Sequence, residues 1–373
     1  MRFPFLRICL AATSLAIAAP STHCLAQAVP LTRGTVITEE TIGVPLTRVG
    51  SVAIARNGTL AAVLTPGPQL MVIRGTGKPL LFSRAGGGPG EVRTPGPMGW
   101  RGDSLWVGDA SLGRVTLFTT SGKLVRTIPV QVPGSPILLA DGGTAVIPMA
   151  RVTVDEQKPA IEKIQRVAGA RVQATLLSLL KRYRAFSVAI GTSHMVGQQP
   201  FDDFPLWAAF NDGSGFVVVK RPAVAPGRPG FTVERYSAQG KLVFTRRYPF
   251  VPTPLTSADV EAAVSGFVSG VPKDAEAAAR THASEAVYRP KYLPTVTRVV
   301  AGEGGAIWLA REATQARQLR WTLLDSRGAV VGDFLVPAGF EGRTGTATAL
   351  WGVERDEDDV PRIVEWRVPA RRP

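Results

Sequence analysis

The chain has 373 residues, of which 43 are Lys or Arg and 29 are Asp or Glu, so its formal net charge is +14. This excess favours anionic partners such as lipopolysaccharide or acidic glycans, although scattered basic residues can also follow from an Arg-rich composition. The two cysteines, Cys9 and Cys24, both lie in the first 24 residues. A disulfide or a thiolate metal site is therefore excluded from the remainder of the chain.

The first 28 residues predict a secretory signal peptide. Arg2 and Arg7 precede an apolar stretch over residues 8–20, which is too short to span a bilayer of about 30 Å, and Ala26-Gln27-Ala28 is a typical cleavage site. The residues before Cys24 do not match a lipobox, so a lipoprotein is not expected. No other apolar run approaches 18 residues, and we expect no transmembrane segment. The mature chain, with 41 basic and 29 acidic residues and a net charge of +12, is predicted to be secreted or periplasmic.

A polar turn followed by a short apolar strand recurs six times along the mature chain. The predicted strands are Leu60–Leu64, Leu105–Val107, Ala145–Ile147, Phe216–Val219, Ile307–Ala310 and, more weakly, Thr348–Val353. Their nearly continuous apolar runs indicate burial on both faces, as in stacked sheets. We interpret them as the inner strands of six repeated units.

A second series of glycine-containing turns alternates with the first. It comprises Gly75–Lys78, Ser121–Lys123, Ala168–Ala170, Gln239–Lys241 and Arg327–Ala329. Each glycine suits the positive φ of a hairpin turn between two outer strands. One such unit cannot bury its own apolar face, so the units must stack or close into a ring.

The repeat predicts an all-β fold, a single six-bladed β-propeller over residues 29–373 with a short helical insertion. Thr256 begins a capping box at the start of that insertion, which covers about residues 253–288. A second long segment, Asp155 to Pro205, fits a helix or strands, and the hairpin position of Gly169 favours strands. We also predict that Val36–Thr41 pairs with Ile363–Val368, because a ring closes most securely when one blade takes strands from both ends of the chain.

Three stretches share a pattern with a known group of proteins. They are Gly86–Glu91 followed by Pro95 and Leu105–Asp109, Leu293-Pro294 leading into Gly305–Leu309, and Trp351–Glu357. The stretches resemble exported six-bladed β-propellers of bacteria, relatives of the NHL and TolB-like propellers, and the likeness extends over most of Val49 to Val368. It implies the fold. Some propellers of related shape are lactonases, lyases or sugar dehydrogenases, but none of their catalytic residues matches a position here.

Repeat position suggests a set of candidate ligand-binding residues. Asp109 and Arg114 follow the second copy of the strand, and Lys220 and Arg311 occupy the equivalent positions in two other units. Side chains at the ends of inner strands can face the central channel or its rim, and a channel mouth lined by Arg114, Lys220 and Arg311 would suit an anionic ligand. The alternative for Asp109 is that it accepts hydrogen bonds from turn amides beside Arg114.

The loop Gly86–Glu91 offers a second candidate. It lacks the ending of a P-loop, and Pro89 removes one N–H donor, so it either shapes the rim of the ring or forms an anion nest. Glu91 and Arg93 follow it as possible partners of each other and as candidate binding residues.

Metal and triad chemistry have little support in the sequence. After the signal peptide only His194 and His282 remain, too few for a zinc site of histidine and cysteine. The run Asp356–Asp359 lacks the spacing of an EF-hand and predicts a solvated turn. We therefore assign no metal, no cofactor and no catalytic residue.

Two functional classes remain. The leading hypothesis is a non-catalytic binding or interaction module, whose partner is a protein, a glycan or another anionic molecule. The alternative is a channel-site enzyme of hydrolase or lyase type that depends on a divalent ion, which at least three converging acidic residues would favour. We expect a monomer and, for an exported chain, no nucleic-acid partner.

Overall fold

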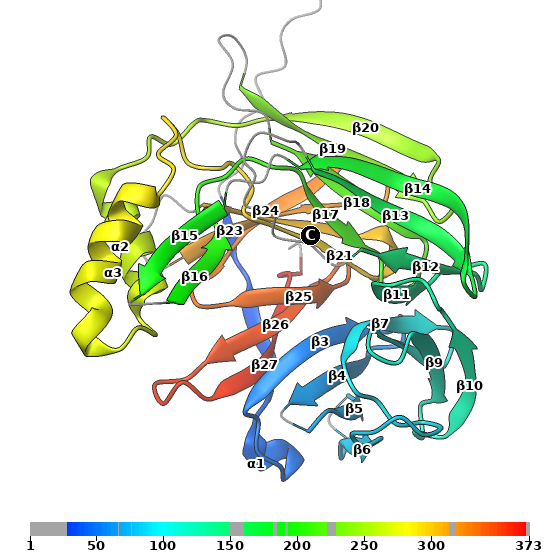
Figure 1. The fold of residues 1–373 in the computed structure, drawn as a ribbon. Coiled ribbons are helices and arrows are strands. Elements are labelled where there is room, and N and C mark those ends of the chain that lie inside the picture. The colour runs from blue at the N-terminus through cyan, green and yellow to red at the C-terminus, as the bar shows by residue number, and fades with distance from the viewer. Residues whose placement is uncertain are drawn as a thin grey trace, which may run out of the picture.

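The computed structural model describes residues 28–370, except for 66, 76, 149–159, 182–184, 191–192, 222–228 and 313–317. The predicted signal peptide thus lies outside the described residues. Within them, six antiparallel sheets form a six-bladed β-propeller (Figure 1). The predicted fold class is confirmed.

Each blade takes its strands in chain order from the axis outwards. Blade 1 contains β3 (Arg48–Ile54), β4 (Thr59–Thr65), β5 (Gln69–Arg74) and β6 (Leu80–Phe82). Blade 2 contains β7 (Pro95–Arg101), β8 (Ser104–Asp109), β9 (Arg114–Thr119) and β10 (Leu124–Pro129). Blade 3 contains β11 (Ser135–Leu138), β12 (Thr144–Ile147), β13 (Ala160–Ala168) and β14 (Arg171–Lys181).

The second half of the ring follows the same pattern. Blade 4 contains β17 (Leu206–Ala209), β18 (Gly215–Lys220), β19 (Gly230–Ser237) and β20 (Leu242–Pro249). Blade 5 contains β21 (Arg298–Ala301), the short 3-10 turn η1 (Glu303–Gly305), β22 (Ile307–Glu312), β23 (Gln318–Leu324) and β24 (Val330–Pro337). Blade 6 contains β25 (Glu341–Gly345), β26 (Ala349–Arg355) and β27 (Pro361–Arg367).

The start of the chain completes the last two blades. β1 (Val29–Pro30) pairs in parallel with β24, and β2 (Thr32–Ile37) pairs with β27, so that Val36 lies opposite Val364. The predicted closure is confirmed, but its strand ends at Ile37. Thr38 instead caps the helix α1 (Glu39–Ile42), because its side chain accepts a hydrogen bond from the backbone N–H of Thr41.

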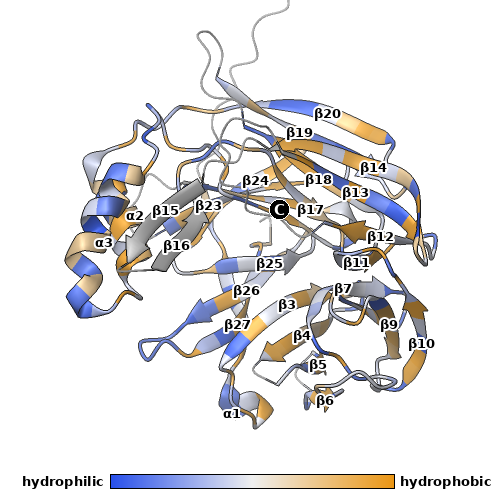
Figure 2. Ribbon diagram, viewed as in Figure 1, coloured by the Kyte–Doolittle hydropathy of each residue, from blue (hydrophilic) through white to orange (hydrophobic). Residues whose placement is uncertain are grey.

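The apolar strand series forms the second strand of each blade, inside the two outer strands that the glycine turns connect, and a further strand lies between it and the axis. The first strands of neighbouring blades contact one another around the axis. Some of them carry small residues, such as Gly50 in β3 and Gly99 in β7, and at Gly99 two blades approach one another closely. The second strands carry the apolar signal because they are covered on both faces, and Figure 2 shows hydrophobic residues along β4 and β12.

The core lies in the seams between blades. One buried cluster joins blades 4 and 5 through Val219, Phe231 and Leu309, and comparable clusters fill the other seams. One glycine in each of the five predicted hairpin turns has positive φ, as expected, with Gly122 at 76° and Gly240 at 75°.

Two insertions leave the ring between blades. Residues 160–181 supply the outer hairpin of blade 3, which confirms strands there, and β15 (Ala185–Ile190) and β16 (Ser193–Gln198) form a separate hairpin. The predicted helical insertion contains α2 (Ser257–Val268) and α3 (Lys273–Ala286). The capping box of Thr256 with Asp259 is present, and α3 contacts β15.

Closure by β2 yields a stability prediction. Ile37 is 1% exposed and lies opposite the fully buried Ile363. We expect Ile37→Ala to lower the free energy of unfolding by about 2–5 kcal/mol, the usual cost of this truncation in a packed core. Thr32→Ala, at the exposed start of the same strand, is the control and should change stability by less than about 0.5 kcal/mol. Equal urea midpoints for the two variants would show that β2 does not stabilise the ring.

Candidate functional site

The alternation of strand direction defines two faces of the ring. Connections between successive blades, and between the second and third strands within a blade, emerge on the same face. Both insertions arise from connections between blades, so we call this side the insertion face. In Figure 1 the helices α2 and α3 lie beside the β15–β16 hairpin.

On this face, the four candidate residues of blade 2 surround the glycine loop. Asp109 is 1% exposed, and its carboxylate accepts hydrogen bonds from the backbone N–H groups of Arg93, Thr94 and Leu112. Asp109 thus satisfies turn amides, as the structural alternative predicts.

Arg114 holds the loop itself. Its guanidinium donates to the carbonyl oxygens of Gly87 and Gly88, at 3.2 and 2.7 Å, and to that of Glu91 at 2.8 Å. The loop therefore directs carbonyls at a cation, whereas an anion nest would direct N–H groups at an anion. This arrangement supports the interpretation that the loop shapes the rim.

Glu91 pairs with Arg84 and not, as considered from the sequence, with Arg93. Its carboxylate accepts from the N–H of Gly88 at 2.7 Å and from Arg84 Nε at 2.7 Å. The Gly88 N–H, followed by Arg84, lowers the pKa of Glu91. The reversal of the chain within the loop places Arg84, seven residues earlier, next to this carboxylate.

Lys220 lies at the seam between blades 3 and 4. Its Nζ is 2.6 Å from the carboxylate of Glu234, which is 8% exposed and also accepts from the hydroxyl of Tyr236 at 2.7 Å. Burial, followed by the bond to Glu234, raises the pKa of Tyr236 to about 12. Lys220 is thus held by a buried carboxylate while its side chain stays about half exposed.

Arg311 lies at the next seam, between blades 4 and 5. Its guanidinium carbon is 5.8 Å from the centroid of the Phe231 ring. Arg320 stands directly opposite it on β23, and like charges in that position repel each other. Within the described part of the chain, the buried Nε of Arg320 has no hydrogen-bond partner. Burial lowers the pKa of Arg311, Asp333 opposes this shift, and Arg320 reinforces it.

The structure does not bring Arg114, Lys220 and Arg311 together at one mouth. All three follow strand ends on the insertion face, but they belong to three different seams. The axial cavity, of about 430 Å³, is lined by other residues, among which Arg343 is the cation. A ligand-binding role for the six candidate residues stays a prediction.

Asn211 spans the axis at the foot of that cavity. Its backbone oxygen accepts from the N–H of Trp100 and the indole of Trp106 in blade 2, both at 3.1 Å. Its side-chain amide donates to the hydroxyl of Thr344 in blade 6 at 2.9 Å. Blades 2, 4 and 6 are thereby tied across the axis. The sequence showed the turn that carries Asn211 but not these contacts.

A cleft of a different character lies where the helical insertion rejoins the ring. Two adjoining cavities, of about 180 and 40 Å³, share Phe250, Leu293, Pro294 and Thr295. We call them together the seam cleft, and its other lining residues are Phe201, Asp203, Arg221, Val251, Thr253, Tyr288, Pro290, Lys291, Tyr292 and Arg311. Of the residues predicted as candidates, Arg311 is the one that reaches it.

Arg221 joins the walls of the seam cleft. It is 5% exposed and donates to the carbonyl oxygens of Asp202, Phe204 and Val296. Burial lowers its pKa to about 10, and the two nearby aspartates oppose the shift. Its position directly after Lys220 was visible in the sequence, but its partners are distant along the chain.

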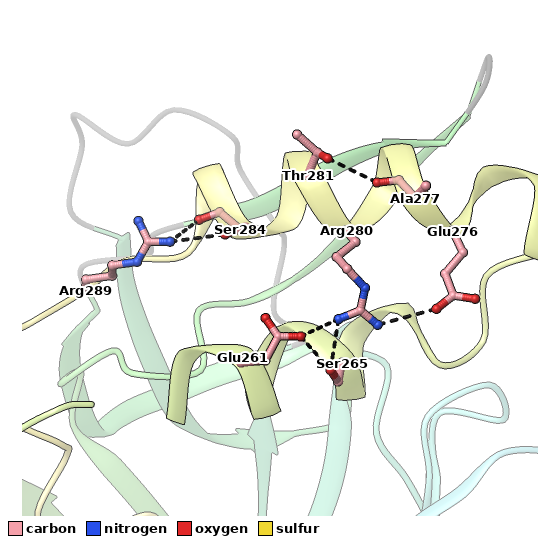
Figure 3. Close-up of polar contacts among 8 residues, drawn as sticks. All are labelled: Glu261, Ser265, Glu276, Ala277, Arg280, Thr281, Ser284 and Arg289. Atoms are coloured by element: carbon pink, nitrogen blue, oxygen red, sulfur yellow. Dashed lines mark hydrogen bonds and ion pairs between the residues drawn. The ribbon is translucent and has the colours of Figure 1, made fainter. Parts of the chain in front are cut away.

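Polar contacts also join the two helices of the insertion beside the cleft. Arg280 of α3 contacts Glu261 at 2.6 Å and Ser265 at 3.0 Å, both on α2, and Figure 3 shows Glu276 approaching it from its own helix. Beneath this layer, Val264 and Ala283 pack with Phe201. The pair of helices α2 and α3 is therefore held together by both polar and apolar contacts. Phe201 belongs to its apolar core and also lines the seam cleft.

No family model matches the chain, and no curated protein matches it. Solved structures do match. A DUF4221 family member from Bacteroides vulgatus is 9% identical, covering 91% of this chain and 98% of that one, with a TM-score of 0.49. Virginiamycin B lyase from Staphylococcus aureus is 10% identical, covering 91% and 99%, with a TM-score of 0.42. Regucalcin, a calcium-binding protein from Agrobacterium tumefaciens, is 13% identical, covering 93% and 98%, with a TM-score of 0.41.

At such identities the likeness concerns the fold alone, and the NHL and TolB-like resemblance stays a prediction. Among the described residues, no three His, Cys, Asp or Glu side chains gather where they could hold a metal ion. The run Asp356–Asp359 forms a turn, as expected, in which Asp356 accepts from the N–H groups of Asp358 and Val360. None of the helices described here is long and apolar enough to cross a membrane.

The axial tie generates a test by glycine substitution. A Cβ on Gly99 would lie 1.7 Å from the backbone oxygen of Asn211, whereas one on Gly266, within α2, would meet nothing within 4 Å. We expect Gly99→Ala to destabilise the protein by at least about 3 kcal/mol and Gly266→Ala to stabilise it by up to about 1 kcal/mol. Thermal unfolding of both variants measures the difference. A Gly99→Ala variant as stable as the parent would mean that the blades do not approach each other this closely.

Proposed function

We propose that this chain is an exported, non-catalytic binding module that recognises an anionic partner at the seam cleft. The observation that carries the proposal is the Arg311–Arg320 pair beside a concave surface. Two guanidinium groups opposite each other repel, and an anionic ligand would relieve that repulsion while gaining charge-assisted hydrogen bonds. Asp333 compensates only part of the local charge, since it supplies one carboxylate near two guanidinium groups.

The remainder of the cleft supports the same assignment. Arg221, Lys291 and Arg311 contribute three cations to its lining, and Asp203 contributes one carboxylate. Aromatic and proline side chains supply most of the other surface, which is typical of pockets that bind part of a ligand by apolar contact and orient it with a few polar groups.

The beginning of the sequence supports export. A charged start, a short apolar stretch and a cleavage site precede β1, whose first residue is Val29. An exported chain with a net charge of +12 would meet acidic glycans, lipopolysaccharide or acidic proteins, and these are the partners we propose. Lys220 lies outside the cleft, but its half-exposed side chain is on the same face and gives a large partner a further cation to contact.

Charge reversal at the cleft tests the proposal. The mature chain would be titrated with polygalacturonate, heparin and lipopolysaccharide at about 0.15 M salt, with neutral dextran as the reference. We expect Arg311→Glu to weaken polyanion binding by about tenfold or more, because it places a carboxylate in a largely desolvated site.

The matched control is Arg327→Glu. It makes the same change of charge in the same blade, at an exposed hairpin turn on the opposite face, and should weaken binding less than about twofold. Equal losses in the two variants would show that net charge alone attracts polyanions, and the proposed site would then be wrong. Retained melting temperatures would confirm that both variants are folded.

A further inference from the structure

We propose that the ligand of the seam cleft is a single sugar ring that carries a carboxylate, as in a hexuronate unit of an acidic glycan. This inference rests on the proposed function and specifies its ligand. It follows from the shape of the cleft, its aromatic walls and the placement of its charges.

The larger cavity has room for one ring. Its volume is about 180 Å³, and its walls include Phe250, Tyr288 and Tyr292, which come from the two ends of the connection between β20 and β21 that contains α2 and α3. Flat aromatic faces bind the C–H surface of a pyranose ring by apolar contact, and tyrosine adds a hydroxyl that can take part in hydrogen bonds. Such walls suit one sugar unit better than a compact ion such as sulfate, which has no apolar face.

Arg311 lines the smaller cavity, within reach of a substituent on a sugar ring bound in the larger one. The smaller cavity adjoins the larger through Phe250, Leu293, Pro294 and Thr295. A ring in the larger cavity would therefore direct one substituent towards the guanidinium. Arginine matches the geometry of a carboxylate with two parallel N–H groups, so a carboxylate is the substituent that this cavity selects.

Lys291 supplies a second positive group at the opening. It is exposed, and its Nζ lies 5.4 Å from the centroid of the Tyr292 ring. A cation over the face of an aromatic ring is held in place by the quadrupole of that ring. Lys291 is thus positioned to contact the next acidic unit of a chain that leaves the cleft.

Asp203 favours a sugar over an aromatic acid. It is exposed at the edge of the larger cavity, and its backbone N–H donates to the side chain of Asp202. An ionised carboxylate only accepts hydrogen bonds. The hydroxyl groups of a sugar can donate to it, whereas a benzoate would bring an electron-rich ring and no donor against a negative charge.

The direct test is calorimetric titration of the mature chain with small probes. These are galacturonate, galactose, benzoate and sodium sulfate, followed by trigalacturonate. We expect galacturonate to bind at least about tenfold more tightly than each of the other small probes, and trigalacturonate to bind more tightly still. Benzoate or sulfate binding as well as galacturonate would overturn the sugar assignment.

Variants separate the contributions of the individual groups. Arg311→Met should abolish the preference for galacturonate over galactose, and Asp203→Asn should weaken galacturonate more than benzoate. Tyr292→Ala should weaken both sugars. Arg327→Met is the matched control and should change none of these affinities, and a melting temperature for each variant identifies any that fails to fold.

The two levels of the proposal fail in different ways. If Arg311→Glu abolishes polyanion binding but galacturonate is not preferred, the seam cleft is an anion site and only the sugar inference is overturned. If Arg311→Glu leaves polyanion binding intact, the proposed function itself is overturned. A preference for galacturonate that survives Arg311→Met would move the sugar site elsewhere on the molecule.

Discussion

Close approach of the blades at the axis is the constraint on which the rest of this structure depends. Trp100 and Trp106 of blade 2 donate hydrogen bonds to the backbone oxygen of Asn211, which leaves no room for a Cβ on Gly99. β7 therefore has a glycine at this point, and large apolar residues of the second and third strands fill the seams between blades. The seams then have the width to bury Phe231 and Leu309 in the core and, at their outer ends, to hold charged side chains.

Local signals predicted the blades because those signals act over a few residues. A glycine with positive φ and an apolar run between turns identify a strand wherever they occur, and the capping box at Thr256 identified a helix for the same reason. The position of a strand within its blade was not predictable in this way. It depends on which edge faces the axis, and an apolar run indicates burial on both faces without indicating that edge.

The candidate site was less accessible because its contacts join distant parts of the chain. Arg221 donates to the carbonyl of Val296, 75 residues away, and Arg311 packs over Phe231 of the previous blade. Repeat position placed Arg311 at a strand end on the correct face. It gave no information on the seam to which each cation belongs, because that depends on whether a side chain points towards the preceding or the following blade.

The pairing of the N-terminal strands β1 and β2 with the last two blades has a consequence for the order in which the chain folds. β1 and β2 leave the ribosome first, yet their partners β24 and β27 are among the last segments to follow. Until then, the chain carries incomplete sheets with unpaired edges, the kind of long-range pairing that folds slowly and invites aggregation. The ring can therefore close only after β27 has been made, so its assembly is a late step that requires nearly the whole of the described chain.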